Sequence, residues 1–268
     1  EGIISKMEIS PGLEIIHTAL WLTQKKILII NDLHLGYEEA WQRKGILVPK
    51  FQLSEIIKEL ESILEKIAPE NPTTVIINGD LKHEFGTVLK QEWKEVLAFL
   101  DFVAGFCENI VILRGNHDPL LRFIAEKRGI QVVTEYTVSD ILIIHGDEIV
   151  DTTSRTGIKR LIIGHEHPAI TLKKGSKREK YKCFLKGTWK MPEGKTREKA
   201  GKREGKAAKE LIAVPSFNPL LEGTDVLKEK LLSPFLEKIA DFEVYVVGKE
   251  DVFCFGKVGE VGKIVRLK

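Results

Sequence analysis

The chain has 268 residues, a hydrophobic content of 43% and a formal net charge of +2. Its length suffices for one large α/β domain or two small ones, and its composition excludes a fibrous or wholly disordered protein. No apolar stretch approaches the ~20 residues that a transmembrane helix needs, so no membrane span is expected. The first residues lack a basic region that leads into an apolar stretch, and this pattern predicts no secretory signal.

The three cysteines, Cys107, Cys183 and Cys254, are isolated and show no CxxC spacing. An odd number of scattered cysteines argues against a disulfide framework or a zinc knuckle. Cys107 and Cys254 have apolar neighbours in the sequence, which predicts buried free thiols. Free thiols are typical of a reducing compartment, so the predicted location is the cytoplasm.

The first 168 residues alternate predicted strands and helices. Apolar residues at helical spacing predict helices over 52–67, with Ser54 as a cap and Pro69 beyond its end, and over 90–106. A third helix is expected over 119–127, with a proline in its first turn. The predicted strands are short, apolar and rich in β-branched residues: 26–30, 73–77, 110–113, 130–134, 141–144 and 160–163.

After residue 168 the chain becomes rich in predicted strands. One helix is expected near 225–232, and the strands are 169–172, 181–185, 211–214, 243–247, 252–255 and 264–267. An α/β first part followed by a β-rich tail predicts two packed sheets flanked by helices, as a single domain over 1–268.

The small net charge hides a strongly basic segment. Residues 173–209 contain 15 Lys and Arg and four Glu, for a charge of +11, which leaves −9 for the rest of the chain. Within it, residues 186–209 lack apolar periodicity, and this predicts a basic, mobile insertion between two strands. Such a run either contacts nucleic acid, with Tyr181 and Trp189 stacking on bases, or is a solvated insertion.

Five predicted strands end in residues that bind metals, and these endings contain six of the seven histidines. In chain order the endings are Asp32-Leu33-His34, Gly79-Asp80-Leu81-Lys82-His83, Gly115-Asn116-His117-Asp118, His145-Gly146-Asp147 and Gly164-His165-Glu166-His167. In an open α/β sheet, functional groups gather at the carboxyl ends of the strands. Side chains that are distant in sequence are therefore expected to converge there.

The residue types in these endings suit two divalent cations. Asp32 and Asp80 supply anionic oxygens and Asn116 an uncharged oxygen, while the histidines supply neutral nitrogens. Two divalent cations carry a charge of +4 and the two carboxylates a charge of −2, so the centre keeps a net positive charge that attracts phosphate. Such a centre can turn bound water into hydroxide near neutral pH. Taken singly, each ending has a simpler explanation as a turn or a helix cap.

The order of the endings resembles the calcineurin-like metallophosphoesterase superfamily, whose pattern is DxH, GD, GNH(D/E), H and GHxH. Each element is present here in that order, and the match is close over residues 26–168. The resemblance implies an α/β fold in the form of a four-layer αββα sandwich, made of two mixed sheets flanked by helices. It also implies a phosphate-ester substrate.

The resemblance further implies a role for each motif residue. One metal would be held by Asp32, His34, Asp80 and His167. The second would be held by Asp80, as a bridge, and by Asn116, His145 and His165. His117 would face the substrate as general acid or as a group that polarises the phosphate, oriented by Asp118. Similar family members favour Mn, and the mixed ligand set also suits Fe or Zn.

The element around Asp80 is similar to the GDxFH element of SbcD-like DNA nucleases, and the chain looks most like archaeal SbcD-related phosphoesterases. In those nucleases the histidine in the position of His83 helps to place the scissile phosphate. Lys82 departs from their usual aromatic residue. His83 is therefore either a substrate contact or a solvated loop residue. Arg114 is either a phosphate contact or part of a strand-end salt bridge.

Three functions are consistent with these residues. The first is a dinuclear nuclease or phosphodiesterase that acts by attack of metal-bound hydroxide with assistance from His117. The second is a small-molecule phosphatase or phosphodiesterase. The third is a non-catalytic scaffold on the same fold, which is disfavoured because no ligand residue is missing. The sequence gives no oligomeric state.

Overall fold

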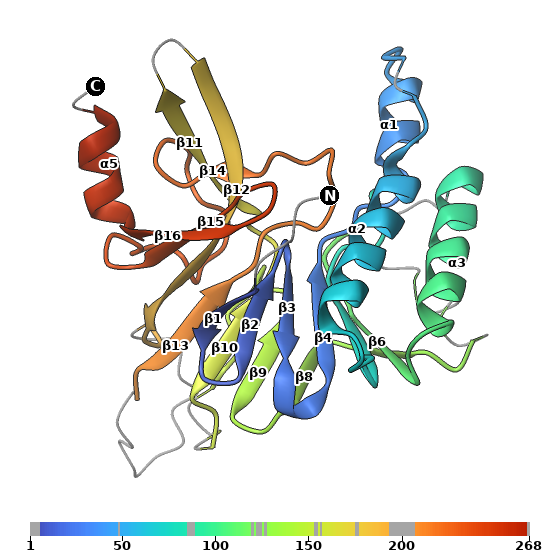
Figure 1. Ribbon diagram of the computed structural model, residues 1–268, viewed down its shortest axis with the longest axis horizontal. Helices are drawn as coiled ribbons and strands as arrows, with labels where there is room; N and C mark the ends of the chain where they lie inside the picture. Colours follow the sequence, from blue (N-terminus) through green and yellow to red (C-terminus); the bar gives the residue numbers. More distant parts are fainter. Residues whose placement is uncertain are drawn as a thin grey trace.

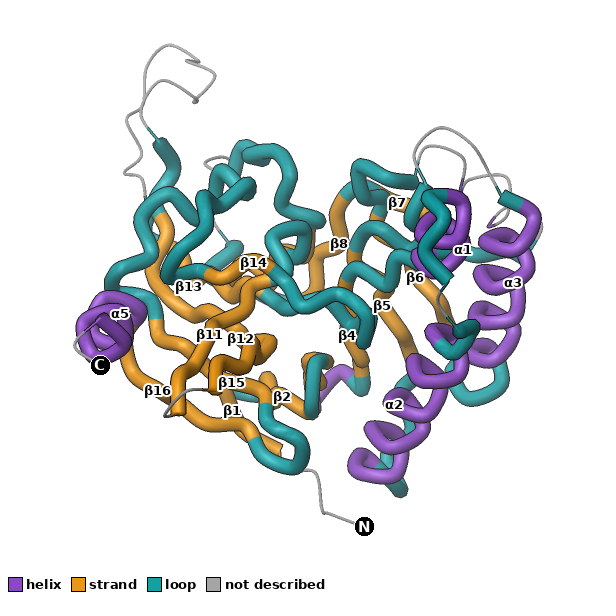
Figure 2. Tube along the Cα trace, turned by 90° about the horizontal axis from the view of Figure 1, so that it is seen from above, coloured by secondary structure: helices purple, strands orange, loops and turns teal. Residues whose placement is uncertain are grey.

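The structure, a computed structural model, describes residues 6–47, 49–84, 89–118, 121, 125, 128–152, 155, 157–174, 177–192 and 207–266. Two mixed β-sheets are flanked by helices, which confirms the predicted fold class (Figures 1 and 2). None of the helices in these ranges combines the length and the apolar composition needed to cross a bilayer.

The first sheet has seven strands in the order β1 to β7. Strands β1 to β4 form an antiparallel meander, and β4 to β7 are parallel to one another. Helices α1 (Tyr37–Arg43), α2 (Gln52–Ile67) and α3 (Lys90–Ala104) follow β4 and β5. The strands are β1 (Lys6–Ser10), β2 (Leu13–Ile16), β3 (Ala19–Leu22), β4 (Ile27–Asn31), β5 (Thr74–Asn78), β6 (Asn109–Leu113) and β7 (Gln131–Val133), with a 3₁₀ turn at Thr23–Lys25.

The second sheet has nine strands, with β14-β11-β12-β13-β10-β9-β8 along its main path and β15 and β16 attached to β12. Its central strands β9, β10 and β13 are parallel, and the others are mostly antiparallel. The strands are β8 (Glu135–Val138), β9 (Ile141–Ile144), β10 (Arg160–Ile163), β11 (Pro168–Lys174), β12 (Lys177–Trp189), β13 (Lys209–Ala213), β14 (Thr224–Asp225), β15 (Glu243–Val247) and β16 (Val252–Lys257), and helix α5 (Val258–Arg266) follows.

The central strands are apolar along their whole length because both of their faces are covered. In β4, Ile29 packs between the two sheets, whereas Leu28 and Ile30 pack against helices α2 and α3. Helix α2 contributes to that outer cluster through buried residues spaced three or four positions apart: Ile56, Leu60, Ile63 and Ile67. The sheets and helices thus form a rigid support for the loops that follow the strands.

Two predicted elements near the C-terminus are wrong. Residues 225–232 form one turn rather than a helix, because Asp225 belongs to β14 and its Oδ1 accepts a hydrogen bond from the Leu227 N–H. The backbone N–H groups of Leu232 and Ser233 then donate to the Glu166 carboxylate, which ends the turn. Residues 264–267 are predicted as a strand, but α5 runs to Arg266.

Three smaller predictions also need correction. Ser54 does not cap α2: its hydroxyl donates to the Phe51 carbonyl, and the first N–H groups of the helix are satisfied by Glu38. Cys254 is exposed and Cys107 is half-buried, whereas both are predicted to be buried, although the three cysteines are free thiols as predicted. The predicted insertion over 186–209 is too long, because β12 extends to Trp189 and β13 begins at Lys209. Residues 193–206, and most of the predicted helix 119–127, lie outside the described residues.

Candidate metal centre

The five strand endings that carry metal-binding residues lie at one edge of the two sheets. Strands β4, β5 and β6 are parallel neighbours in the first sheet, and β9 and β10 are parallel neighbours in the second. Each ending begins within two residues of its strand's last residue. The two sheets therefore present their carboxyl ends, and the ligand residues, to a common space.

The side chains form three groups whose ligand atoms lie within 4.8 Å of one another; one consists of His34, His83 and His117, and the other two contain a carboxylate. Of these two, the first group is Asp32, His34 and His167, and the second is Asp80, His145 and His165. Asp80 lies between the groups, because its Oδ2 is 3.6 Å from both His34 Nε2 and His145 Nε2. All residues of these two groups are predicted as ligands from the sequence.

Asn116, the seventh predicted ligand, lies beside the second group. Its Oδ1 is 3.0 Å from His145 Nε2, and that nitrogen is 3.2 Å from His165 Nδ1. A carboxamide oxygen so close to two imidazoles completes a mixed oxygen and nitrogen set, which suits a first-row transition metal.

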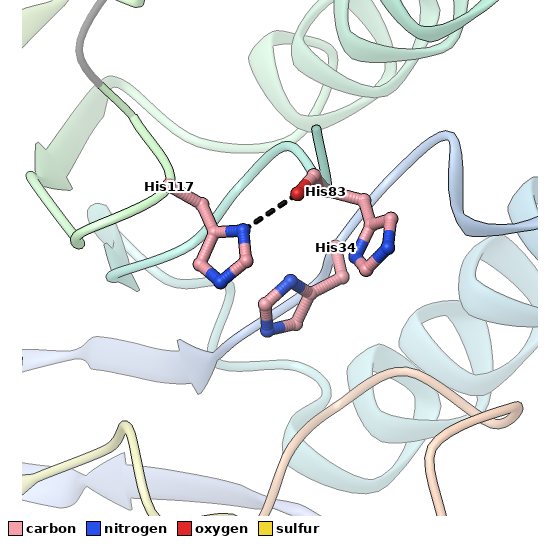
Figure 3. Close-up of side chains that lie close together, drawn as sticks. All are labelled: His34, His83 and His117. Atoms are coloured by element: carbon pink, nitrogen blue, oxygen red, sulfur yellow. Dashed lines mark hydrogen bonds between the residues drawn. The ribbon is translucent and has the colours of Figure 1, made fainter. Parts of the chain in front are cut away.

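His83 and His117 face the same space from the loops after β5 and β6, where they meet His34 (Figure 3). His117 Nδ1 is 2.6 Å from the His83 carbonyl oxygen. A carbonyl only accepts hydrogen bonds, so Nδ1 carries the proton and Nε2 is left facing Asp80 Oδ2 at 3.8 Å. The backbone of one loop thus fixes the ring of the other.

Asp118 has a different contact from the one predicted. Its buried carboxylate accepts hydrogen bonds from the backbone N–H groups of Gly115, Leu81 and Lys82, at 3.1, 3.2 and 3.3 Å. Among the described residues its carboxylate partners are backbone groups, not the His117 ring. Burial raises the pKa of Asp118 to about 6. Asp118 therefore ties the loop after β6 to the loop after β5, and it acts on His117 only through the backbone.

Arg114 lines a cavity of about 310 Å³ that opens beside the second ligand group. Asn116, His145, Asp147 and Glu148 line the same cavity. Arg114 is exposed and makes no salt bridge within the described part of the chain. Two roles are predicted for Arg114, a phosphate contact and a strand-end salt bridge. The salt bridge is absent among the described residues.

Several ligand residues have a strained backbone. Among the described residues, eight that are not glycine have a positive φ, and five of these are predicted ligands: Asp32, His34, Asp80, His165 and His167. Histidine and aspartate adopt this conformation infrequently, at a cost of about 1–2 kcal/mol each. Strain of this kind persists where a site requires a particular geometry. Its concentration at the predicted ligands is what a preorganised binding site would show.

The electrostatics of the centre also fit bound cations. Asp32 and Asp80 are buried, and within the described chain their ion-pair partners are histidines only. Burial, together with the nearby Asp32 carboxylate, raises the pKa of Asp80 to about 9. Asp32 Oδ1 and His34 Nδ1 are buried without a hydrogen-bond partner in the described structure. Two adjacent buried carboxylates without a fixed cation would be stabilised by metal ions.

Two of the ligand histidines, His34 and His145, are held in the form that binds metals. Burial and the neighbouring imidazoles lower the pKa of His34 well below its usual value. Burial is also the largest cause that lowers the pKa of His145 to about 4. Both imidazoles are therefore neutral at pH 7, with a lone pair available for coordination.

Glycines beside the ligands allow the loops to approach closely. A Cβ atom at Gly115 would lie 2.1 Å from Asp80 Oδ1, and one at Gly79 would lie 1.9 Å from His145 Nδ1. Gly79 also has a φ of +80°, which favours glycine. The glycine of each motif therefore has a steric function in assembling the centre.

Gly79→Ala is expected to destabilise the fold by roughly 2–4 kcal/mol, because a left-handed alanine and a collision with His145 both add cost. Gly45→Ala is the matched control: Gly45 has a φ of +81° and no atom within 4 Å of its Cβ position. It should lose only about 1–2 kcal/mol. Urea unfolding measures both variants. Equal losses would show that the approach of His145 to Gly79 is unimportant.

Sequence reasoning missed several residues that hold the ligands. Asn78 Nδ2 donates to the Ile144 carbonyl at 3.0 Å and so links the two sheets just before Asp80 and His145. Gln52 Nε2 donates to the His34 carbonyl at 2.8 Å, and Ser216 Oγ donates to the Asp32 carbonyl at 2.7 Å. Only Asn78 had a signal in the sequence, since it is a polar residue at the end of an apolar strand.

The chain matches the family model of the calcineurin-like phosphoesterases over residues 25–248, and it therefore belongs to this family. The match covers all of the ligand residues described above. Among curated protein sequences no significant match is found.

Solved structures with related folds include a nuclease called MPE from Pseudomonas putida. It is 16% identical, with a TM-score of 0.62, over 94% of this chain and all of that one. Two more distant structures are AQ665 from Aquifex aeolicus, a protein of unknown function, and Vps29 from Entamoeba histolytica in complex with zinc. AQ665 is 19% identical, with a TM-score of 0.36, over 53% of this chain and 78% of its own. Vps29 is 13% identical, with a TM-score of 0.34, over 85% of this chain and 96% of its own. At 16% identity, the Pseudomonas putida structure supports the fold alone.

Proposed function

We propose that this protein is a dinuclear metal-dependent phosphoesterase that hydrolyses phosphodiester bonds, with nucleic acid as its substrate. The observation that carries the proposal is the position of Asp80 between two ligand groups, 3.6 Å from a histidine of each. A single carboxylate shared by two groups is the arrangement that a two-metal centre requires.

In this proposal one metal is held by Asp32, His34, Asp80 and His167, and the other by Asp80, Asn116, His145 and His165. When bound, the two ions would supply positive charge at the scissile phosphate and acidify a coordinated water. Mn is the first metal to test, with Fe and Zn as alternatives, since the ligands combine imidazole nitrogens with hard oxygens.

The other residues would act on the substrate directly. His117 presents Nε2 to the centre, where its doubly protonated imidazolium form would donate the Nε2 proton to the leaving oxygen, while Nδ1–H stays bonded to the His83 carbonyl. His83, three residues after Asp80 as in SbcD-like nucleases, would contact the phosphate. Arg114 would bind a neighbouring phosphate from the cavity beside Asn116.

Two features favour nucleic acid over a small ester. The similar Pseudomonas putida protein is a nuclease, which makes nucleic acid the first substrate class to test. The basic segment 173–209 includes the last residues of β11 and all of β12, and these two strands form a hairpin on the same side of the molecule as α1 (Figure 1). Because β11 begins directly after the predicted ligand His167, this basic hairpin would attract a polyanion towards the centre.

The deciding experiment is a substrate panel with the metal-loaded protein: bis-p-nitrophenyl phosphate, p-nitrophenyl phosphate, single-stranded DNA and double-stranded DNA. We expect hydrolysis of the diester and of DNA, with DNA cleavage falling steeply as salt increases. Activity confined to small esters would indicate a small-molecule phosphatase or phosphodiesterase instead. No hydrolysis with Mn, Fe or Zn, together with no metal binding, would indicate a scaffold and overturn the proposal.

A further inference from the structure

A row of aromatic rings extends from the metal centre to the end of helix α1. The Tyr37 ring lies 4.7 Å from the His83 ring at an interplanar angle of 82°, and the Trp41 ring lies 5.1 Å from the Tyr37 ring at 49°. His83 in turn is 5.5 Å from His34, a predicted ligand. Tyr37 and Trp41 are half-buried, so neither residue is fully enclosed by the core.

Helix α1 is held firmly in place by the helices beside it. The Gly36 N–H, at its start, donates to Glu95 Oε2 at 3.1 Å, and the Glu92 N–H donates to Glu39 Oε2 at 3.3 Å. Glu38 accepts hydrogen bonds from the first N–H groups of α2. Because these contacts come from both α2 and α3, the aromatic row is preorganised rather than mobile.

The outer end of the row is apolar and positively charged. Ile46 is 49% exposed and Leu47 is 96% exposed. Arg43, Lys44 and Lys50 are also exposed, and none forms a salt bridge with another described residue.

A purely structural role in packing explains the aromatic row and its neighbouring cations less well than a binding role does. Rings that served only to fill a core would be buried like Trp21, and free cations would not be needed beside them. Aromatic faces interleaved with unpaired cations are the combination that binds an unpaired nucleic-acid strand, because bases stack on the rings and phosphates pair with the cations.

We propose that the row formed by His83, Tyr37 and Trp41, flanked by Arg43 and Lys44, is a binding track for single-stranded nucleic acid next to the scissile bond. One or two bases stack on Tyr37 and Trp41, and the cations contact the phosphates between them. This inference rests on the proposed function for the substrate at the metal centre. It adds that the strand is unpaired on this side of the scissile phosphate.

The test compares Trp41→Ala and Trp41→Phe with the wild-type protein. Binding of a fluorescein-labelled oligo(dT) is measured by anisotropy in the presence of EDTA, so that no cleavage occurs. We expect Trp41→Ala to weaken binding roughly 10- to 100-fold and Trp41→Phe to restore most of it, since phenylalanine also stacks. Lys44→Gln should reduce the slope of log affinity against log salt by about one.

Phe253→Ala provides the matched control, because Phe253 is an aromatic residue on β16 that is 51% exposed. It should leave oligo(dT) affinity and hydrolysis of bis-p-nitrophenyl phosphate unchanged. For Trp41→Ala, the loss of kcat/KM on single-stranded DNA should exceed any loss on bis-p-nitrophenyl phosphate by at least roughly 10-fold. The small diester also reports whether the variant is folded.

The outcomes separate the two proposals. If Trp41→Ala binds oligo(dT) like the wild type, or loses affinity for duplex and single-stranded DNA equally, the track is refuted even when the protein is an active phosphoesterase. If the metal-loaded wild type hydrolyses no ester, the proposed function fails. The oligo(dT) binding assay still tests the proposed track in that case, because it does not depend on cleavage.

Discussion

Asp80→Asn should remove or strongly weaken metal binding in both ligand groups at once. Asp80 Oδ2 is equidistant from His34 and His145, at 3.6 Å, so each group loses its shared anionic ligand. An asparagine is nearly isosteric, but it supplies no negative charge to offset the second cation. We expect turnover to fall by well over about 100-fold, since even outer partners of metal ligands contribute 10- to 100-fold.

Elemental analysis of the metal-loaded variant measures this effect separately from activity. The wild type should bind two ions per chain and Asp80→Asn fewer. The wild type should also gain thermal stability when the metal is added, because an ion that binds only the folded state stabilises it. Asp140→Asn is the control, because Asp140 pairs with Arg160 and lies outside the centre. Two tightly bound ions in Asp80→Asn would contradict the bridging role.

His117→Ala should have the opposite pattern, with both metals retained and most turnover lost. His117 is in neither of the two groups that contain the carboxylates, and its Nε2 lies 3.8 Å from Asp80 Oδ2, farther than the ring nitrogens of His34 and His145. Loss of a general acid typically costs 10²- to 10⁴-fold in rate. We expect a fall of that order in kcat with little change in metal content.

The dependence on the leaving group tests the role of His117 more directly. A diester whose leaving group is p-nitrophenolate departs without much help from an acid, whereas a DNA 3′- or 5′-oxygen needs a proton. His117→Ala should therefore lose much more activity on DNA than on bis-p-nitrophenyl phosphate. An equal loss on both would show that His117 binds the phosphate rather than protonating the leaving oxygen. Unchanged turnover would refute any role in the reaction.

The convergence of the metal-binding residue types could be predicted because the sequence signals for it were local. Each ligand follows a buried apolar strand, and parallel strands bring their carboxyl ends together whatever the details of the helices. That logic places His34, Asp80 and His145 in one space from the sequence alone, although their individual roles remain predictions. The mixed, helix-flanked sheets follow from the same alternation of apolar runs.

Other parts of the fold had no such local signal. The strands β1 to β3 are short and joined by tight turns, one of which contains His17 at a positive φ, a position that sequence rules assign to glycine or asparagine. Helix α1 has only seven residues, too few for a clear period. The four-residue spacing of Tyr37 and Trp41 indicates that their rings are neighbours only once the helix is known. Glycines within α5 lowered its helical propensity and obscured it.

The ligands come from two separate sheets, and this has a consequence for how the protein becomes active. Asp32 and Asp80 follow strands of one layer, whereas His145, His165 and His167 follow strands of the other. Each of the two ligand groups that contain a carboxylate takes ligands from both layers. Both groups would therefore be complete only after the layers dock, so a partly folded chain would lack the proposed hydrolytic activity.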